Sequence, residues 1–396
     1  MITLSPARNL VDFGFIGVNP SGERIEGFSA PLQCLLFVLA YGASGLQYEL
    51  FFQLQTWICT FLLGVLICCF MRCIDLDGFT ALSAGVLTLV IIASSSHFLI
   101  FHCSGLENPI THVTYLAFFT TAVCSYRTGY PHILLVPCAL SASWSRHEGI
   151  FHVLPLLIAF TFFHYRRYRR PRVFWVVAAF AAAWSFLFLV RFSYFGDLVP
   201  NTAHGQGIYV PANLGAFFDM PALPSKIALA GAFIYRLSGI GLVIGLLLLA
   251  VARIPKDHDF VPAGIMIVLG LVVLHAFVFG PAKHAAYRTV SFWTIFSALL
   301  LSYGLFHSRL GLKQKGMVAL FVTAPACLFL WKAVPPFDLC CDTRGFSEFR
   351  TLFKNLAADH RLHRPFVANP DLGLMTFHKD FNVIDWGILE IGLWPL

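Results

Sequence analysis

The sequence predicts an all-α polytopic membrane protein, with about ten spanning helices followed by a small α/β segment. Apolar residues make up 58% of the 396-residue chain and charged residues only 12%, whereas about a quarter of the residues in a soluble domain are charged. Long apolar stretches recur throughout residues 51–334. The net charge of +7 is concentrated in the short loops between them, which indicates a topology signal and no nucleic-acid partner.

Residues 1–50 are predicted to form a first outer loop with a juxtamembrane helix. The first thirty residues are polar and glycine-rich, and they lack the basic region and apolar core of a signal peptide. Residues 31–46 are apolar, but about 16 residues are fewer than the roughly 20 that a spanning helix needs. We therefore expect a helix that lies at the membrane surface or re-enters the membrane.

Residues 51–334 are predicted to form the transmembrane domain. Its apolar stretches cover residues 51–73, 79–101, 111–126, 131–145, 149–164, 173–195, 227–252, 260–280, 287–307 and 316–334. The loop 165–172, Y-R-R-Y-R-R-P-R, contains five arginines and no acidic residue, which predicts a cytoplasmic location. The loop with Arg309, Lys313 and Lys315 agrees, because an even number of stretches separates the two loops.

The cysteines are predicted to be packing residues. Most of the eleven lie inside apolar stretches, and their spacing matches no metal site. Examples are Cys59, Cys68, Cys69 and Cys124.

Residues 335–396 are predicted to form a small extracytoplasmic α/β segment. Its apolar runs at 366–368 and 382–384 are separated by Gly and Pro, as expected of short strands between turns. Residues at helical spacing precede them, namely Phe346, Phe349, Phe353 and Leu356.

Five polar motifs fall in loops opposite to the arginine-rich loop. They are N-P-S-G-E-R-I-E-G-F-S-A-P-L (19–32), S-G-L-E-N-P (104–109), S-R-H-E-G (145–149), Y-F-G-D-L-V-P-N-T (194–202) and K-H-A-A-Y-R (283–288). Arginine binds phosphate oxygens with two parallel hydrogen bonds, and carboxylates accept sugar hydroxyls or act as general bases. This pattern suits a phosphate-linked sugar at a membrane face. The candidate binding residues are Arg24, Glu26, Glu107, Arg146, Glu148, Asp197, Asn201, Lys283 and Arg288.

Each motif also has a structural interpretation. Glu107 is then a helix cap or an interfacial charge, Arg146 and Glu148 form a structural ion pair, and Asp197 is an N-cap. Single histidines are then hydrogen-bonded packing groups, among them His97, His102 and His204. The occurrence of five such motifs on one side of the membrane favours a common site.

The motifs resemble those of a known family. E-R-I-E-G-F-S-A-P-L, S-G-L-E-N-P, R-H-E-G and Y-F-G-D-L-V-P-N-T, in this order, resemble recurring motifs of bacterial GT-C glycosyltransferases that use polyprenyl-phosphate sugars. The likeness is greatest to enzymes similar to the terminal arabinofuranosyltransferases of mycobacterial cell walls. Residues 371–389, D-L-G-L-M-T-F-H-K-D-F-N-V-I-D-W-G-I-L, resemble the extracytoplasmic segment that follows the last helices in that family.

The resemblance implies a GT-C-like bundle of about eleven spans in the bacterial inner membrane. It implies transfer of a sugar, with inversion, from a polyprenyl-phosphate donor to a glycan, lipid or protein acceptor of the cell envelope at the periplasmic face. An acidic residue of the first outer loop activates the acceptor hydroxyl in that family, and a divalent metal is optional. By position, Glu26, Arg146, Glu148, Asp197 and Asn201 are implied to line the site.

The chain departs from the family pattern at several positions. An Asp pair normally precedes the stretch I-T-L-S-P-A-R-N-L, and Met1 stands where that pair should end. The first helix and the base are then expected upstream, and Glu26 is the nearest acidic candidate. The family's Lys after P-N-T is Gln206, and its acid near residue 281 is absent, leaving Lys283 and Arg288 for phosphate. Two hypotheses follow: the natural start lies upstream, or the protein is an inactive remnant without its base.

Two other functions compete with the glycosyltransferase. A secondary transporter should show repeated halves and broken helices that meet near the bilayer midplane, whereas these motifs lie at the ends of predicted spans. A non-catalytic membrane scaffold is the alternative if the base is missing.

Overall fold

The computed structural model describes two compact units. The described residues are 4–17, 24, 26, 28–103, 105–198, 241–252, 254, 258–279, 290–333, 351–352, 354–355, 358–360, 366–369 and 382–385. Unit 1 comprises Met1–Gln53, Ser185–Leu214 and Pro335–Leu396, and unit 2 comprises Leu54–Trp184 and Gly215–Val334. Residues 1–50 and the C-terminal segment therefore fall in the same unit.

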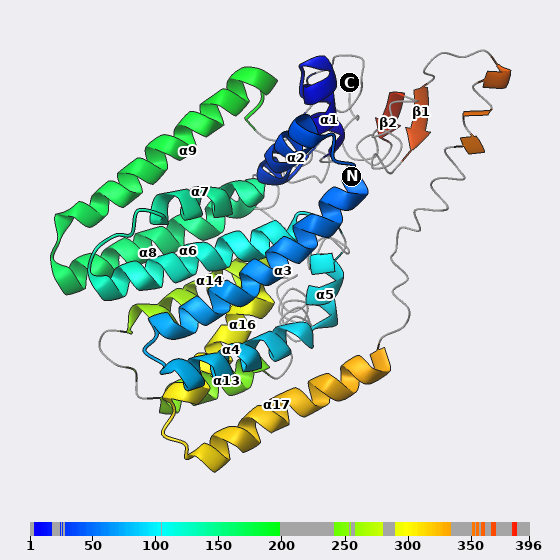
Figure 1. Ribbon diagram of the computed structural model, residues 1–396. Helices are drawn as coiled ribbons and strands as arrows, with labels where there is room; N and C mark the ends of the chain where they lie inside the picture. Colours follow the sequence, from blue (N-terminus) through cyan, green and yellow to red (C-terminus); the bar gives the residue numbers. More distant parts are fainter. Residues whose placement is uncertain are drawn as a thin grey trace, which may run out of the picture. The chain divides into compact units, whose positions relative to one another are not determined.

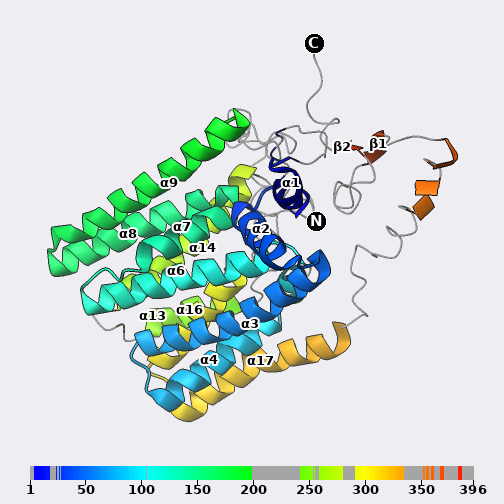
Figure 2. The same cartoon turned by 45° about the horizontal axis from the view of Figure 1, so that its top comes forward.

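Unit 2 is a bundle of helices that lie side by side (Figures 1 and 2). Its helices are α3 (Tyr48–Cys73), α4 (Gly78–Ala93), α5 (Ser96–Cys103), α6 (Asn108–Thr128), α7 (Leu135–Ser145), α8 (Ile150–Tyr168), α9 (Phe174–Phe195), α13 (Gly241–Val251), α14 (Phe260–Phe279), α16 (Trp293–His307) and α17 (Leu312–Ala333). Short 3-10 turns, η1 (His147–Gly149) and η2 (Pro171–Val173), precede α8 and α9. Helices α3 and α9 also contribute residues to unit 1.

Helix α16 lies at the centre of this bundle. Its residues from Trp293 to Leu305 are all buried, and it packs against α4, α13 and α14. A Cβ atom added at Gly245 would lie 3.1 Å from the backbone nitrogen of Leu301, and one added at Gly304 would lie 3.2 Å from the carbonyl oxygen of Gly245. These glycines let α13 and α16 approach closely, as small residues do between membrane helices.

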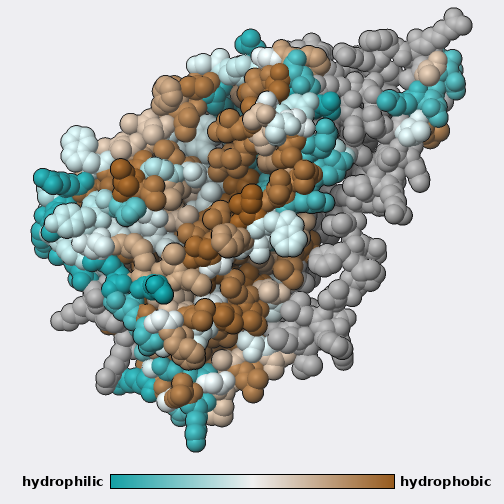
Figure 3. Space-filling model, viewed as in Figure 1, coloured by the Kyte–Doolittle hydropathy of each residue, from teal (hydrophilic) through white to brown (hydrophobic). Residues whose placement is uncertain are grey.

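The helices carry the apolar surface of a membrane protein. Within the described residues, three are long and apolar enough to cross a bilayer, namely Tyr48–Cys73, His147–Tyr168 and Pro171–Phe195. Large apolar side chains stay exposed on them, such as Phe61 at 70% and Trp175 at 75%, and Figure 3 shows a largely apolar face. Soluble proteins rarely expose such continuous apolar surface. The prediction of a mostly helical membrane protein is confirmed at this level.

Two predicted spans differ from the helices in the structure. Residues 79–101 were expected to form one helix, but α4 ends at Ala93 and α5 begins at Ser96. The Ser94 hydroxyl donates to the carbonyl of Ile91 at 2.6 Å, and the Ser95 hydroxyl accepts from the amide of Phe98 at 3.3 Å. Serine hydroxyls that bond to nearby backbone groups compete with helical bonds, which explains the break.

The second difference is at residues 131–145, where helix α7 begins only at Leu135. The amide of His132 donates to the Ser125 hydroxyl at 2.9 Å. This bond holds the preceding residues in a turn at the end of α6.

Unit 1 contains α1 (Leu4–Phe13), α2 (Pro31–Ser44) and two short strands. The expected short helix is present as α2, which begins with Pro31 and ends at Gly45 with φ 65°, a conformation that favours glycine. Helix α1 was not predicted, because the first thirty residues were interpreted as a polar loop. Leu4 and Ala7 of α1 are nevertheless buried in a cluster with Phe37.

The two strands are β1 (Phe366–Asn369) and β2 (Asn382–Asp385). They pair in parallel, with Phe366 opposite Asn382, so the two apolar runs of the C-terminal segment form strands as predicted. The residues predicted to form its helix, Phe346, Phe349, Phe353 and Leu356, lie outside the described residues.

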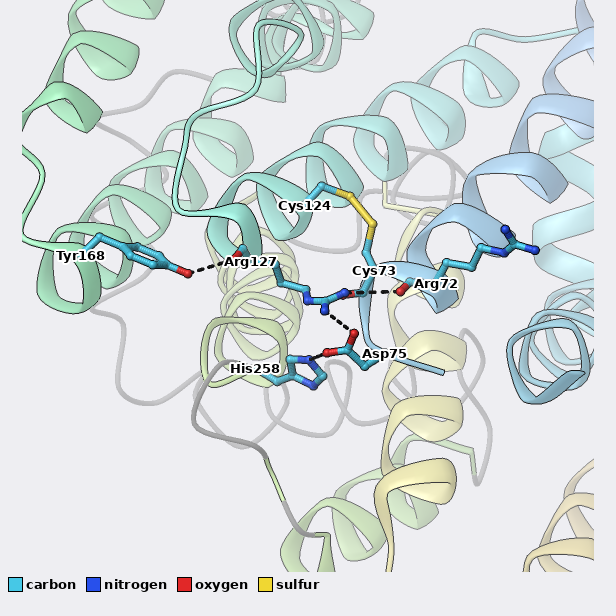
Figure 4. A network of polar contacts seen from close by, with 7 residues as sticks. All are labelled: Arg72, Cys73, Asp75, Cys124, Arg127, Tyr168 and His258. Carbon is cyan, nitrogen blue, oxygen red and sulfur yellow. Dashed lines mark hydrogen bonds and ion pairs between the residues drawn. A yellow bond between two sulfur atoms is a disulfide. The ribbon is translucent and has the colours of Figure 1, made fainter. Parts of the chain in front are cut away.

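Cys73 at the end of α3 forms a disulfide with Cys124 of α6 (Figure 4). The interpretation of Cys124 as a packing residue is therefore wrong. The two cysteines are 51 residues apart in the sequence, and only tertiary packing brings them together. The described free cysteines include Cys59, Cys68 and Cys69. Cys59 is buried, as expected of a packing residue, Cys68 is partly buried, and Cys69 is exposed.

A polar network surrounds the disulfide (Figure 4). Arg127 donates to the carbonyl of Cys73 at 2.6 Å and forms an ion pair with Asp75. His258 Nε2 lies 3.1 Å from the other carboxylate oxygen of Asp75, and the Tyr168 hydroxyl donates to the carbonyl of Arg127 at 3.0 Å. The network connects the ends of α3, α6 and α8 with His258, which precedes α14.

We expect the disulfide to stabilise unit 2. Cys73→Ser should lower the free energy of unfolding of the oxidised protein by about 2–4 kcal/mol, because the bond closes a long loop in the unfolded chain. Thermal unfolding in detergent with and without reductant measures this effect. The exposed Cys69→Ser is the control and should keep the reductant sensitivity of the wild type, while Cys73→Ser should lose it. Reductant sensitivity in Cys73→Ser equal to that of the wild type would contradict the pairing.

Candidate functional site

Three predicted binding residues meet in unit 2. Arg146 Nε donates to Glu148 Oε1 at 2.5 Å, and Arg146 Nη1 pairs with Glu107 Oε1. The side chains of Glu107 and Arg146 are only 1% and 8% exposed, while that of Glu148 is 21% exposed. The structure therefore confirms that Arg146 and Glu148 pair, and it adds Glu107 as a second carboxylate. We call these three residues the carboxylate–arginine cluster.

Local backbone structure explains how the cluster forms. Arg146 is extended, with φ −149° and ψ 152°, between the end of α7 and η1. A Cβ atom at Gly149 would lie 2.8 Å from the carbonyl oxygens of Ala142 and Ser143. Only glycine allows this turn to pack so closely against α7, which gives the glycine of R-H-E-G a structural reason.

Glu107 occupies the N-cap position of α6, but its side chain makes no capping hydrogen bond. The expectation of a helix cap is therefore wrong for this side chain, although the position at a helix end is right. The carboxylate pairs with Arg146 instead, because an arginine buried without a counter-charge would be far more costly than an uncapped helix end.

Aromatic and histidine side chains surround the cluster. The Tyr115 hydroxyl lies 3.5 Å from the carbonyl oxygen of Gly149 and 3.3 Å from His152 Nδ1. The rings of His152 and His275 are 5.4 Å apart. None of these three was predicted as a site residue. The spacing of four residues between Glu148 and His152 was a usable signal for a shared helix face, but Tyr115 and His275 gave none.

The cluster combines one guanidinium with two carboxylates. Because Arg146 bonds to Glu148 through Nε and to Glu107 through Nη1, a phosphate that binds this guanidinium competes with both carboxylates for its N–H groups. Glu148 is the more exposed partner, so it is the one expected to move. Carboxylates freed in this way can accept hydrogen bonds from the hydroxyl groups of a sugar.

A second ion pair lies in unit 1. Arg191 Nε donates to both carboxylate oxygens of Glu26 at 2.9 Å, and Nη2 donates to Oε2 at 2.5 Å. Arg191 Nη1 donates to the carbonyls of Asp197 and Leu198 at 3.0 and 3.1 Å. Glu26 is 2% exposed. This geometry fastens the segment containing Glu26 to the turn that follows α9.

The pairing bears on Glu26 as a candidate base. An arginine that donates to both oxygens stabilises the ionised carboxylate and makes it a weak base. Burial, together with the charge of Glu26, also raises the pKa of the Cys34 thiol to about 12. The contacts of Arg191 with both carboxylate oxygens fit a Glu26 held in a structural pair.

The other predicted residues are placed as follows. The Arg24 guanidinium carbon lies 4.9 Å from the centre of the Tyr194 ring, and Asp197 contributes its backbone carbonyl to Arg191. Asn201, Lys283 and Arg288 lie outside the described residues. Across the described part of the chain, no three His, Cys, Asp or Glu side chains are placed to hold a metal ion together.

A chain of hydrogen bonds, buried at His102, His112 and Ser291, links α3, α5, α6 and the turn before α16. His102 Nε2 lies 3.0 Å from the Thr60 hydroxyl, and His102 Nδ1 lies 2.9 Å from His112 Nδ1. His112 Nε2 lies 2.8 Å from the Ser291 hydroxyl, to which Asn108 Nδ2 donates at 2.9 Å. The prediction that His102 is a hydrogen-bonded packing group is confirmed. The side chain of His97 and all of His204 lie outside the described residues.

In this series of hydrogen bonds, every donor and acceptor can be assigned when both histidines are neutral. The Thr60 hydroxyl donates to the carbonyl of Thr56 at 2.8 Å, so it accepts from His102 Nε2. His102 Nδ1 is then an acceptor, His112 Nδ1 is a donor, and His112 Nε2 accepts from Ser291. A neutral imidazole has one donor and one acceptor nitrogen, and this assignment satisfies both rings.

Comparison of the chain with protein-family models, curated proteins and solved structures gives no match.

The cluster predicts an order of stability for two substitutions. Glu107→Gln should lower the free energy of unfolding by about 3 kcal/mol, because it removes a buried counter-charge of Arg146. Glu148→Gln should cost only about 1 kcal/mol, because this carboxylate is partly exposed and Glu107 still pairs with Arg146. Thermal unfolding in detergent measures both, with the exposed Glu49→Gln as a control. The reverse order would show that Glu107 is not the main partner.

The histidine chain predicts specific tautomers. Nitrogen NMR of protein labelled at histidine should show His102 protonated at Nε2 and His112 at Nδ1. Thr60→Val removes the acceptor of His102 and should lower the free energy of unfolding by about 1 kcal/mol. Thr323→Val is the matched control, because the Thr323 hydroxyl donates to the carbonyl of Ala319 in its own helix. Protonation at the opposite nitrogens would contradict the assigned donors and acceptors.

Proposed function

We propose that this protein is a GT-C-type glycosyltransferase of about ten spans in the bacterial inner membrane. It transfers a sugar from a polyprenyl-phosphate donor to a glycan, lipid or protein acceptor at the periplasmic face. The carboxylate–arginine cluster carries this proposal, because it unites the S-G-L-E-N-P and R-H-E-G motifs through direct ion pairs between Arg146, Glu107 and Glu148. The small α/β segment would then lie on the periplasmic side.

The cluster matches the chemistry of such a donor. The guanidinium of Arg146 suits the anionic phosphate, and the two carboxylates suit the hydroxyls of the sugar. In an inverting transfer, the acceptor hydroxyl oxygen bonds to the anomeric carbon while the bond from that carbon to the phosphate oxygen breaks. The polyprenyl phosphate leaves with the bonding electrons, and the acceptor proton passes to a base. We do not assign this base to Glu26, since Arg191 donates to both of its carboxylate oxygens.

A proposed topology accompanies the proposed function. The five arginines of residues 165–172 favour a cytoplasmic location for that loop. One helix, α8, separates the motif at 145–149 from this loop, and three helices, α6, α7 and α8, separate the motif at 104–109 from it. Because both numbers are odd, the two motifs would face the periplasm.

A secondary transporter is the second candidate. The break between α4 and α5 favours it, because transporters use discontinuous helices at their binding sites. The carboxylate–arginine cluster argues against it, since Glu107 stands at the N-cap of α6 and Glu148 in the turn before α8. These positions are helix ends, whereas transport sites lie near the middle of the bilayer.

Arg146→Lys tests the proposed role of the cluster. Lysine keeps the charge but lacks the planar fork, so turnover of a polyprenyl-phosphate sugar should fall on the order of a hundredfold. Glu148→Gln should weaken donor binding, because an amide accepts hydrogen bonds from sugar hydroxyls less strongly than a carboxylate, while the free energy of unfolding falls by only about 1 kcal/mol. The exposed Arg72→Lys is the control and should leave turnover unchanged. Donor binding, turnover and thermal unfolding are measured on the full chain.

The outcomes separate the three functions. Normal donor binding and turnover in Arg146→Lys would exclude Arg146 from the site. Sugar uptake into proteoliposomes without transfer to an acceptor would support the transporter. If the protein neither binds the donor nor takes up sugar, this result would support a non-catalytic scaffold.

A further inference from the structure

A strongly basic surface in unit 2 has no part in the proposed reaction. It consists of Arg166, Arg167, Arg169, Arg170 and Arg172, at the end of α8 and the start of α9; we call it the arginine surface. All but Arg170 are exposed. Within the described part of the chain, Arg166, Arg169, Arg170 and Arg172 form no ion pair with an acidic side chain. Figure 3 shows hydrophilic side chains gathered at this end of the two helices, at the left of the view.

Tyrosine rings hold several of these arginines in place. The Arg170 guanidinium carbon lies 4.0 Å from the centre of the Tyr130 ring, and Arg170 Nη1 donates to the carbonyl of Gly129 at 2.6 Å. The guanidinium carbon of Arg169 lies 5.9 Å from the Tyr165 ring. Cation–π contacts of this kind restrict the side chains without neutralising their charge, so Arg169 and Arg170 keep their positive charge in a defined arrangement.

The turn below the surface is itself closely packed. Gly129 has φ 70°, and a Cβ atom there would lie 2.8 Å from the ring of Tyr168. The Tyr168 hydroxyl donates to the carbonyl of Arg127. The arginine surface therefore rests on a fixed joint between α6 and α8 instead of a freely moving loop.

Exposed apolar residues border the arginine surface. Trp175 is 75% exposed and Ile133 is 86% exposed, and Phe174 and Tyr130 are also exposed. Helices α8 and α9, which meet here, belong to two of the candidate spans. Aromatic residues beside arginines at the end of a span are typical of the membrane–water interface. The arginines therefore stand at the depth of lipid headgroups.

Nearby acidic groups already have partners. Asp259 accepts a hydrogen bond from the Tyr126 hydroxyl, and Asp75 pairs with Arg127. Within the described residues, Arg166, Arg169, Arg170 and Arg172 thus have no acidic partner, and their charge can attract external anions. Arginine binds phosphate oxygens with its planar fork, and clusters of four to eight basic residues beside a span attract anionic lipids.

We propose that the arginine surface is a binding site for the anionic headgroups of phospholipids. The tyrosine contacts place the guanidinium groups at fixed positions, and the apolar border accommodates the beginning of the acyl chains. The site selects phosphatidylglycerol-like lipids over zwitterionic phosphatidylcholine, because only the former carry an uncompensated phosphate charge.

Two double variants of the full chain test the site. Arg166→Gln/Arg172→Gln removes two charges from the arginine surface. Arg309→Gln/Lys313→Gln removes two exposed charges from the other basic loop of unit 2 and is the matched control. Affinity for phosphatidylglycerol is measured by native mass spectrometry in detergent, with phosphatidylcholine and inorganic phosphate as comparison ligands, and thermal unfolding checks that each variant is folded.

We expect the first double variant to bind phosphatidylglycerol about tenfold or more weakly, and the control to bind it as the wild type does. Phosphatidylcholine should bind equally weakly to all three proteins. Equal losses in both double variants would overturn the proposal, because the effect would then come from net charge alone. Displacement of phosphatidylglycerol by millimolar inorganic phosphate would also overturn it, since it would indicate a free-anion site.

Discussion

The structure depends on one constraint, namely that each buried arginine must pair with a carboxylate. Arg146 is buried away from water, and a charge in an apolar interior is costly unless it is paired. Arg146 meets this requirement with Glu107 and Glu148. Because the three residues come from the start of α6 and the turn between α7 and α8, their pairing also determines how these helices meet. The same ion pairs therefore form the candidate site and hold these helices together.

The same constraint gives similar residues different roles. Glu26 and Glu148 both pair with an arginine, but Arg191 donates to both oxygens of Glu26 and also to two backbone carbonyls. A ligand that displaced Glu26 would break every contact between Arg191 and this carboxylate. Glu148 shares Arg146 with Glu107 and is partly exposed, so its displacement leaves the guanidinium paired. The exchangeable carboxylate is Glu148, which is why we place the substrate there.

The sequence predicted what depends on local composition. The apolar stretches located α3, α8 and α9, and the short helix α2 followed from the length of its apolar run. Features that depend on side-chain bonds were missed: the Ser94 and Ser95 bonds that divide α4 from α5, and the burial of α1. Within the site, the pair Arg146–Glu148 was predictable from its spacing. The contacts of Glu107, Tyr115 and His275 were not, because they join residues far apart in the chain.

The arginine surface and the disulfide place opposing demands on the same end of unit 2. Five arginines resist translocation and favour the cytoplasm, whereas a disulfide persists only in an oxidising compartment. Arg127 and Tyr168 connect the two features through direct hydrogen bonds, so both face one compartment. With the arginines in the cytoplasm, Cys73 and Cys124 are adjacent thiols in the cell that pair on exposure to oxidant. With the disulfide formed in the cell, the carboxylate–arginine cluster faces the cytoplasm. The oxidation state of these two cysteines in cells therefore reports on which side of the membrane the proposed transfer occurs.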